Sequence, residues 1–114
     1  MLYKKPAILA AEAASAKKSE DIIVLDVRKL TPFTDYFVIV TVNSQPQAQA
    51  VREAIADSLA DHGVELRNRQ QQLSKRWVLL DFAGVLVHIF IKEAREFYNL
   101  ERLWSKAVKV KWEK

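Results

Sequence analysis

The chain has 114 residues, of which 50% are hydrophobic and 28% are charged, a balance that indicates one globular domain large enough to bury its own core. It contains no cysteine, which excludes disulfides, thiolate metal sites and cysteine nucleophiles. The longest apolar runs have the length of strands, and charged residues interrupt and follow the alanine-rich N-terminal stretch. We therefore expect neither a transmembrane helix nor a signal peptide, and we expect a cytoplasmic location.

The formal net charge of +4 is unevenly distributed along the chain. Residues 67–76 carry four cations and no acid, and residues 105–114 carry four lysines against one glutamate. Basic stretches of this kind favour a position near nucleic acid. The alternative is a solvated loop and a solvated tail, which is the commoner role of such charge runs.

Three elements are predicted in the first part of the chain. Residues 6–18 are typical of a helix, because Pro6 suits a first helical position and the alanines that follow have high helix propensity. Residues 21–27 and 36–42 are nearly continuous apolar runs of strand length. Such runs indicate central strands that are buried on both faces.

Residues 43–63 form the clearest predicted helix. Ser44 and Gln47 fit a capping box at its start, and Gly63 fits the position that follows its end. Apolar residues at three- and four-residue spacing give the helix one buried stripe, formed by Ala48, Val51, Ile55 and Leu59.

A β-hairpin is predicted around Ala83-Gly84, which separates two apolar runs at 76–82 and 85–91. A two-residue loop sets the register and puts apolar pairs on one face, the expected core: Phe82 with Val85, Leu80 with Val87 and Val78 with Ile89. The opposite face is mixed and pairs Asp81 with Leu86, Leu79 with His88 and Trp77 with Phe90. A mixed face is either covered by a helix layer or presented to a partner.

Four stretches flank this hairpin. Residues 64–67 indicate a short edge strand, and the polar residues 68–75 indicate a mobile loop. Residues 92–104 have aromatics and leucines at helical spacing, and residues 107–112 alternate like a strand without an obvious core to join. The order α-β-β-α-β-β-β-α predicts a single α/β domain in which helices pack on a mixed sheet of about five strands.

Motifs for catalysis and cofactor binding are missing from the sequence. Gly63 and Gly84 are its only glycines, too few for a phosphate-binding loop, and no aspartates form the D-x-D pair of a two-metal nucleotidyl-transfer site. Two histidines without any cysteine do not make a zinc site. We therefore expect no enzymatic activity, no cofactor and no metal.

Four residues of the hairpin and the following helix each have two interpretations. His88 is either a general base or partner contact, or a strand histidine whose ring a neighbour satisfies, and the second is commoner. Asp81 is either a metal ligand or, more often, a residue that bonds backbone groups at the turn. Trp77 and Tyr98 each belong either to the core or to an interface.

Five segments of the sequence are similar to those of one family. They read D-Y-F-V-I-x-T at 35–41, S-x-x-Q at 44–47, W-x-x-x-D at 77–81, V-H-I-F at 87–90 and R-x-F-Y-x-L-E-x-L-W at 95–104. This set resembles the ribosomal silencing factor family, also called iojap-like proteins. The resemblance extends from about residue 7 to residue 104 and leaves the lysine-rich tail outside the family pattern.

The resemblance implies an α/β fold related in shape to the nucleotidyltransferases but without their catalytic residues. It implies that the protein binds the large ribosomal subunit through that subunit's fourteenth protein, on the face that meets the small subunit. Joining of the small subunit is then blocked, and translation is repressed under nutrient limitation. A role in large-subunit maturation and a homodimer whose surface overlaps the docking surface also belong to what the resemblance implies.

On this interpretation, the chain divides into a silencing factor-like domain at residues 1–104 and a basic C-terminal tail at residues 105–114. The residues expected to bind the partner are Arg76, Trp77, Leu79, Tyr98 and Leu100. Structural support is expected from Asp81, His88 and Trp104. The basic loop 67–76, whose Lys75 and Arg76 are expected to steer the partner by charge, and the tail are expected to contact ribosomal RNA.

Two alternative functions stay open at this point. The first is a small nucleotide-binding or nucleotidyl-transfer domain that uses Asp26, Asp35 and Asp81, and the missing D-x-D pair weighs against it. The second is a general RNA binder that works through the two basic stretches. It predicts a steep salt dependence of binding and no need for Trp77.

The sequence departs from the family pattern at three places. Val42 replaces a usual glycine, residues 69–72 replace a usual Glu-Gly pair with Arg-Gln-Gln-Gln, and Ala83-Gly84 replaces the usual Gly-Asp at the hairpin turn. The first and third departures concern local backbone conformation. The second makes the loop more basic.

Overall fold

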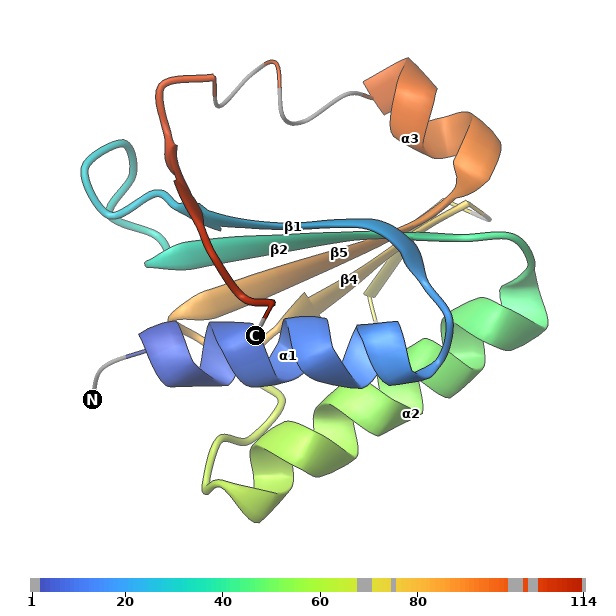
Figure 1. Cartoon of the computed structure of the whole chain (residues 1–114), viewed down its shortest axis with the longest axis horizontal. Coiled ribbons are helices and arrows are strands. Elements are labelled where there is room, and N and C mark those ends of the chain that lie inside the picture. Colours follow the sequence, from blue (N-terminus) through green and yellow to red (C-terminus); the bar gives the residue numbers. More distant parts are fainter. Residues whose placement is uncertain (1–2, 68–70, 75, 99–101, 103–104, 114) are drawn as a thin grey trace.

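A sheet of six strands in the described part of the chain separates two layers of helix (Figure 1). The computed structural model describes residues 3–67, 71–74, 76–98, 102 and 105–113. In chain order the elements are α1 (Lys4–Ala16), β1 (Glu20–Asp26), β2 (Tyr36–Val42), α2 (Gln45–Asp61), β3 (Gln71–Ser74), β4 (Trp77–Asp81), β5 (Val85–Ile91), α3 (Lys92–Tyr98) and β6 (Val108–Val110). Helices α1 and α2 cover one face of the sheet and α3 lies on the other (Figure 1). The predicted α/β domain is confirmed.

The strands lie in the order β3-β4-β5-β2-β1-β6. β2 and β5 pair in parallel at the centre, and the other neighbouring pairs of the described strands are antiparallel. A parallel pair requires a crossover connection, which α2 provides between β2 and the later strands. All seven residues of β2 are buried, as its apolar run predicts, whereas β1 is buried only toward its C-terminal end.

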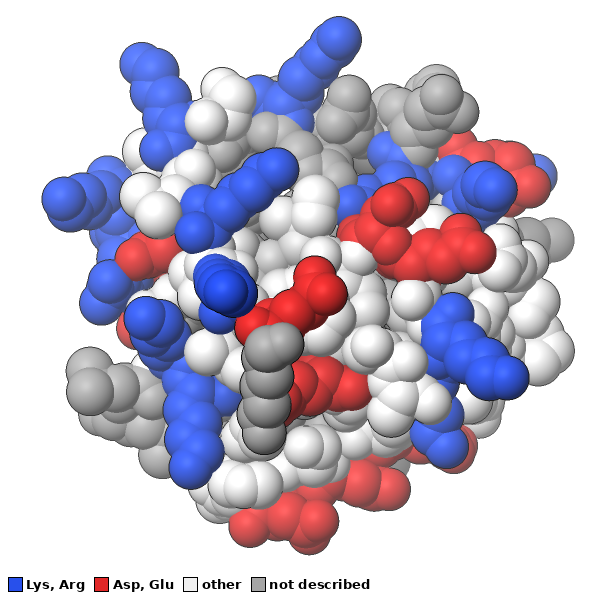
Figure 2. Space-filling model, in the orientation of Figure 1, with Lys and Arg blue, Asp and Glu red and all other residues white. Residues whose placement is uncertain are grey.

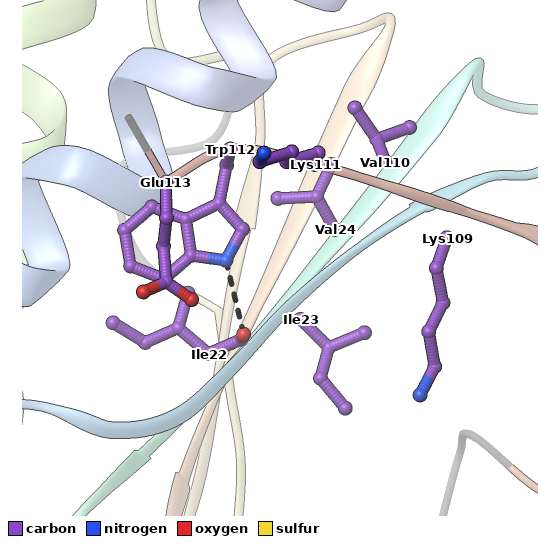
Figure 3. Close-up of a pocket in the computed structure, with 8 residues that line it drawn as sticks. All are labelled: Ile22, Ile23, Val24, Lys109, Val110, Lys111, Trp112 and Glu113. Carbon is purple, nitrogen blue, oxygen red and sulfur yellow. Dashed lines mark hydrogen bonds between the residues drawn. The ribbon is translucent and has the colours of Figure 1, made fainter.

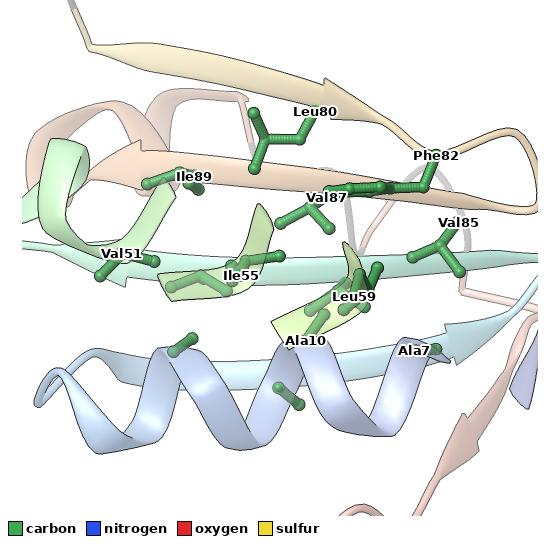
Figure 4. Close-up of a cluster of buried hydrophobic side chains, with 14 of the residues drawn as sticks. Ala7, Ala10, Val51, Ile55, Leu59, Leu80, Phe82, Val85, Val87 and Ile89 are labelled. Carbon is green, nitrogen blue, oxygen red and sulfur yellow. The ribbon is translucent and has the colours of Figure 1, made fainter. Parts of the chain in front are cut away.

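The main core lies between the sheet and the α1–α2 layer. α1 contributes four alanines that are fully buried, namely Ala7, Ala10, Ala11 and Ala14. Because alanine side chains are small, the α1 backbone can lie close to both the sheet and α2. Figure 4 shows the apolar stripe of α2 facing the hairpin. The residues labelled there are buried both in α2, namely Val51, Ile55 and Leu59, and in the hairpin, namely Leu80, Phe82, Val85, Val87 and Ile89. The predicted core face of the hairpin is confirmed.

The start of α2 is held by its own cap and by the end of α1. The Ser44 Oγ accepts a hydrogen bond from the Gln47 backbone N–H at 3.2 Å, and the Gln47 Oε1 accepts one from the Asn43 N–H at 2.8 Å. The Gln47 Nε2 donates to the carbonyl oxygens of Lys17 and Lys18, each at 3.2 Å. The predicted capping residues therefore satisfy one helix terminus and also join it to another.

The β4–β5 ladder has the predicted register along its whole length. Trp77 lies opposite Phe90 at one end of the ladder and Asp81 lies opposite Leu86 at the other. A slip of one residue would exchange the two faces, so this register decides which side chains reach the core. The mixed face of the hairpin is therefore turned toward the α3 side of the sheet.

The hairpin turn combines a strained alanine with a glycine that has no room for a side chain. Ala83 has φ +72°, at the first loop position where glycine is the usual residue of a two-residue turn. Gly84 lies against the ring of Tyr3, which a Cβ at that position would overlap. The Asp81 Oδ1 accepts a hydrogen bond from the Ala83 N–H at 2.9 Å, which helps to hold the turn.

Two predictions between α2 and the hairpin are wrong. Residues 64–67 form no strand: Val64 is buried in the core, and the Arg67 N–H donates to the Asp81 carbonyl oxygen at 2.7 Å. The edge strand is instead β3, within the stretch 68–75 that was expected to be a loop, and its Gln71 lies opposite Leu79. Hydrogen bonding to β4 forms this strand in spite of its polar sequence.

The C-terminal segment also differs from its prediction, since it has a sheet to join. β6 pairs antiparallel with the end of β1, where Val110 lies opposite Val24. Trp112 follows it, and its Nε1 donates to the Ile22 carbonyl oxygen at 3.2 Å (Figure 3). β1 would otherwise present unpaired backbone groups along this edge, and the segment satisfies them.

Candidate docking site on the α3 face

The mixed face of the hairpin is partly covered and partly exposed. Phe90 is fully buried in a second apolar cluster on the α3 side of the sheet, to which α3 contributes Ala94. Trp77, Leu79 and Leu86 are each half-buried. The two alternatives for this face thus apply to different parts of it: α3 covers the Phe90 region, and side chains of β4 stay accessible.

Trp77 is held in a fixed orientation by an aromatic cluster. Its ring centroid lies 5.1 Å from that of Phe90 and 5.8 Å from that of His88. The His88 ring stacks on Phe90 with an interplanar angle of 9° and meets the Phe37 ring edge to face at a centroid distance of 4.8 Å. Four rings from β2, β4 and β5 therefore support one another.

One hydrogen bond within this cluster fixes the protonation of His88. The Trp77 Nε1 and the His88 Nδ1 are 3.2 Å apart, and since an indole N–H can only donate, Nδ1 must be the acceptor. The proton of the neutral imidazole is then on Nε2, a buried atom with no hydrogen-bond partner among the described residues. Burial lowers the pKa of His88 to about 4, so the ring is neutral near pH 7.

The contacts of His88 match those of a strand histidine whose ring a neighbour satisfies. A buried imidazole with a pKa of about 4 is a weak base at neutral pH. Its unprotonated nitrogen, Nδ1, already accepts the hydrogen bond from Trp77. Asp81 likewise bonds the backbone of the turn, as expected. His88 therefore contacts Trp77 of the candidate site, whereas Asp81 bonds the turn at the other end of β4.

The structure places three of the five expected partner-binding residues in one stretch of chain. Arg76 is exposed directly before β4, and Trp77 and Leu79 are on the same face of β4. Tyr98 is the last residue of α3, and nothing is described of its side chain. Lys75, Leu100 and Trp104 lie outside the described residues, so their predicted roles stay predictions.

A contact that the sequence interpretation did not assign joins α3 to the sheet. The Arg95 Nη1 donates to the Oγ1 of Thr41, a buried residue of β2, at 2.6 Å. Both residues belong to the segments that resemble the family, which was the signal available in the sequence. A charged donor on a buried hydroxyl is among the stronger hydrogen bonds, so this one helps to set the position of α3.

Two of the three aspartates of the alternative function bind different partners. Arg28 binds Asp26 with its Nη2 2.7 Å from Oδ2 and its Nε 3.0 Å from Oδ1, and this guanidinium lowers the pKa of Asp26. Asp81 serves the hairpin turn. Within the described ranges, no three His, Cys, Asp or Glu side chains gather where they could hold a metal ion. The geometry gives the nucleotidyl-transfer alternative no support.

No helix in the described part of the chain is long and apolar enough to cross a membrane.

Comparisons with known proteins give one consistent family. A family model described as "Ribosomal silencing factor during starvation" matches residues 3–114, so the match includes the C-terminal segment. The chain is 39% identical over 99 residues to a ribosomal silencing factor of Bacillus subtilis, covering 87% of this chain and 84% of the relative. It is 38% identical over 113 residues to the chloroplastic protein Iojap of Zea mays, covering 91% of this chain and 45% of that longer protein.

Solved structures agree with the sequence comparisons. A crystal structure from Chromobacterium violaceum superposes with a TM-score of 0.85 at 32% identity, covering 92% of this chain and 88% of that one. A crystal structure from Bacillus halodurans has a TM-score of 0.75 at 35% identity, covering 90% and 93%. The chain therefore belongs to the ribosomal silencing factor family.

Proposed function

We propose that this protein represses translation by binding the large ribosomal subunit on the face that meets the small subunit, and that it thereby blocks subunit joining when nutrients are limited. Membership of the silencing factor family supports the regulatory role. The proposed partner is the fourteenth protein of the large subunit. The proposed setting is the cytoplasm.

The observation that carries the site is the half-buried indole of Trp77, immobilised by Phe90 and His88 beside the accessible Leu79. Tryptophan and arginine are the residues most enriched among binding hot spots, and an ordered side chain loses little entropy on binding. Trp77 and Leu79 would contact the ribosomal protein together with Tyr98 and Leu100. Arg76, exposed next to them, would steer the approach by charge.

Co-sedimentation with purified large subunits tests this proposal. The double variant Trp77→Ala with Tyr98→Ala is expected to lose binding, because loss of one hot-spot tryptophan alone weakens an interface by about 30-fold or more. Glu53→Ala is the matched control and should bind like the wild type, because Glu53 is at an exposed position of α2, on the opposite side of the sheet from α3. Circular dichroism and thermal unfolding check that each variant is folded.

Two results would separate the site from the function. If the double variant still co-sediments with large subunits, the assignment of Trp77 and Tyr98 is wrong. If the wild type neither binds large subunits nor prevents subunit joining in a sucrose gradient, the proposed function itself is wrong. Binding of a nucleoside triphosphate with magnesium, measured by calorimetry, would instead favour the alternative based on Asp26, Asp35 and Asp81.

A homodimer and a role in large-subunit maturation are further proposals that rest on the family alone. Analytical ultracentrifugation of the free protein tests the first. If the dimer surface overlaps the docking surface, the double variant should also shift the protein toward the monomer.

A further inference from the structure

The strand order separates the two basic stretches through which RNA binding was expected. Residues 71–74 form β3 at one edge of the sheet, and residues 108–110 form β6 at the other. Six strands with a spacing of about 4.8 Å put these edges more than about 20 Å apart. The lysines of the C-terminal segment must therefore be considered with other neighbours.

Those neighbours are in the loop between β1 and β2. Val108 lies opposite Asp26, so β6 begins where this loop leaves β1. Lys29, Lys106 and Lys109 are exposed here, and Figure 2 shows Lys and Arg side chains gathered on the side where the loop and the C-terminal segment lie. The nearby Asp26 carboxylate is already paired with Arg28.

The same place holds exposed apolar side chains. The large hydrophobic residues that are exposed in the described part of the chain are Leu30 at 40%, Phe33 at 85% and Val108 at 66%. All three lie in the β1–β2 loop or at the start of β6. We call the surface formed by Lys29, Leu30, Phe33, Lys106 and Lys109 the loop–tail patch.

The exposure of Phe33 does not come from a loosely held loop. The Leu30 and Thr31 N–H groups donate to the Val27 carbonyl oxygen at 2.9 and 3.1 Å. The Thr31 Oγ1 accepts from the Phe33 N–H at 3.2 Å, and the Arg28 guanidinium lies 5.5 Å from the centre of the Tyr36 ring. An ordered loop thus presents an aromatic ring to solvent.

The C-terminal lysines are also held in place. β6 is anchored by its pairing with β1, and the half-buried Trp112 that follows it packs on the main core and bonds Ile22. In Figure 3, Lys109 points away from Trp112. Two ordered segments, far apart in the sequence, therefore combine lysines with one exposed aromatic ring.

We propose that the loop–tail patch binds an unpaired segment of RNA, with Phe33 stacking on a base and Lys29, Lys106 and Lys109 contacting phosphates. Exposed aromatic rings and lysines together are the chemistry by which single-stranded nucleic acid is bound, whereas the cores of protein interfaces are depleted of lysine. This site is separate from the α3-face docking site. It rests on the proposed function only in that ribosomal RNA is the expected source of the segment.

Binding to a fluorescein-labelled oligouridine of about 12 nucleotides, followed by anisotropy, tests the patch without any ribosomal protein. Phe33→Leu is expected to weaken binding at least about fivefold and Phe33→Tyr to retain it, because tyrosine keeps an aromatic ring that stacks on a base and leucine does not. Replacing Lys29, Lys106 and Lys109 by glutamine is expected to reduce the slope of log K against log salt by about 2. The charge-matched control replaces the exposed Lys17, Lys18 and Lys92 by glutamine and should leave that slope unchanged.

Three outcomes would overturn the proposal. The wild type could fail to bind the oligonucleotide, Phe33→Leu could bind as tightly as Phe33→Tyr, or both lysine triples could change the slope equally. Co-sedimentation of the same variants with large subunits identifies a different occupant. If the variants lose subunit binding but bind the oligonucleotide as tightly as the wild type does, the patch is a protein contact and the RNA assignment is refuted. Because the oligonucleotide assay contains no ribosomal protein, RNA binding by the patch and docking through Trp77 can each fail while the other succeeds.

Discussion

Replacing His88 by asparagine should change how the stability of this protein depends on pH. The asparagine Oδ1 takes approximately the place of the His88 Nδ1 and can accept the Trp77 indole N–H, but the asparagine has no proton to gain in acid. The substitution therefore removes the titration while it keeps the hydrogen bond. Any loss of stability from the smaller side chain is independent of pH and does not affect the comparison.

The size of the effect follows from the burial of His88. The unfolded chain takes up this proton near pH 6.5 and the folded chain only near pH 4. As the pH falls, the proton therefore stabilises the unfolded state first. The contribution of His88 is fully present above pH 6.5 and is lost between pH 6.5 and 4, which costs the wild type about 3 kcal/mol of unfolding free energy.

Urea unfolding of both proteins at several pH values from 7 to 4 measures this difference. The carboxylates, including Asp26 with its lowered pKa, titrate in both proteins and cancel when one curve is subtracted from the other. The difference curve should change by about 3 kcal/mol, with the wild type losing more stability in acid. Parallel curves would refute the reasoning, because they would mean that His88 titrates alike in the folded and unfolded chains.

Five further substitutions, at four positions, test local features of the fold through urea or thermal unfolding. Ala83→Gly should stabilise the protein by about 0.5 to 1 kcal/mol because Ala83 has φ +72°, whereas Gly63→Ala, at φ +79°, should destabilise it by about 1 kcal/mol; equal signs would contradict the strain argument. Thr41→Val removes the acceptor for Arg95 and should cost about 1 to 2 kcal/mol, while Thr41→Ser should cost less. Leu59→Ala in the fully buried stripe of α2 should cost about 2 to 5 kcal/mol, and a cost below 1 kcal/mol would show that the core collapses around the cavity.

The candidate docking face has its geometry because the two faces of one hairpin pack into different clusters. Alternate residues of β4 and β5 build the main core, and the residues between them build the aromatic cluster on the α3 side. Partner binding through Trp77 is therefore linked to the stability of the fold, because Trp77 depends on His88 and Phe90 for its orientation. Substitutions of Trp77 must therefore be judged against the stability of each variant.

Local features of this protein could be predicted from its sequence. The length of the Ala83-Gly84 connection determined the register of β4 and β5, and the Ser44 and Gln47 pair determined the start of α2. Each of these depends on residues a few positions apart, so backbone geometry and hydrogen bonding within the segment decide the outcome. The apolar stripe of α2 followed from periodicity, and the core face of the hairpin followed from alternation together with the register that the turn sets.

Only the tertiary structure decided which distant segments meet. An alternating tail does not reveal that β1 leaves an edge open for it, and a run of glutamines has no strand preference until β4 offers backbone partners for β3. The low pKa of His88 also required the packing of three other rings around it. Strand pairing and burial join residues far apart in the chain, and for that reason the loop–tail patch could not be read from either of its two segments.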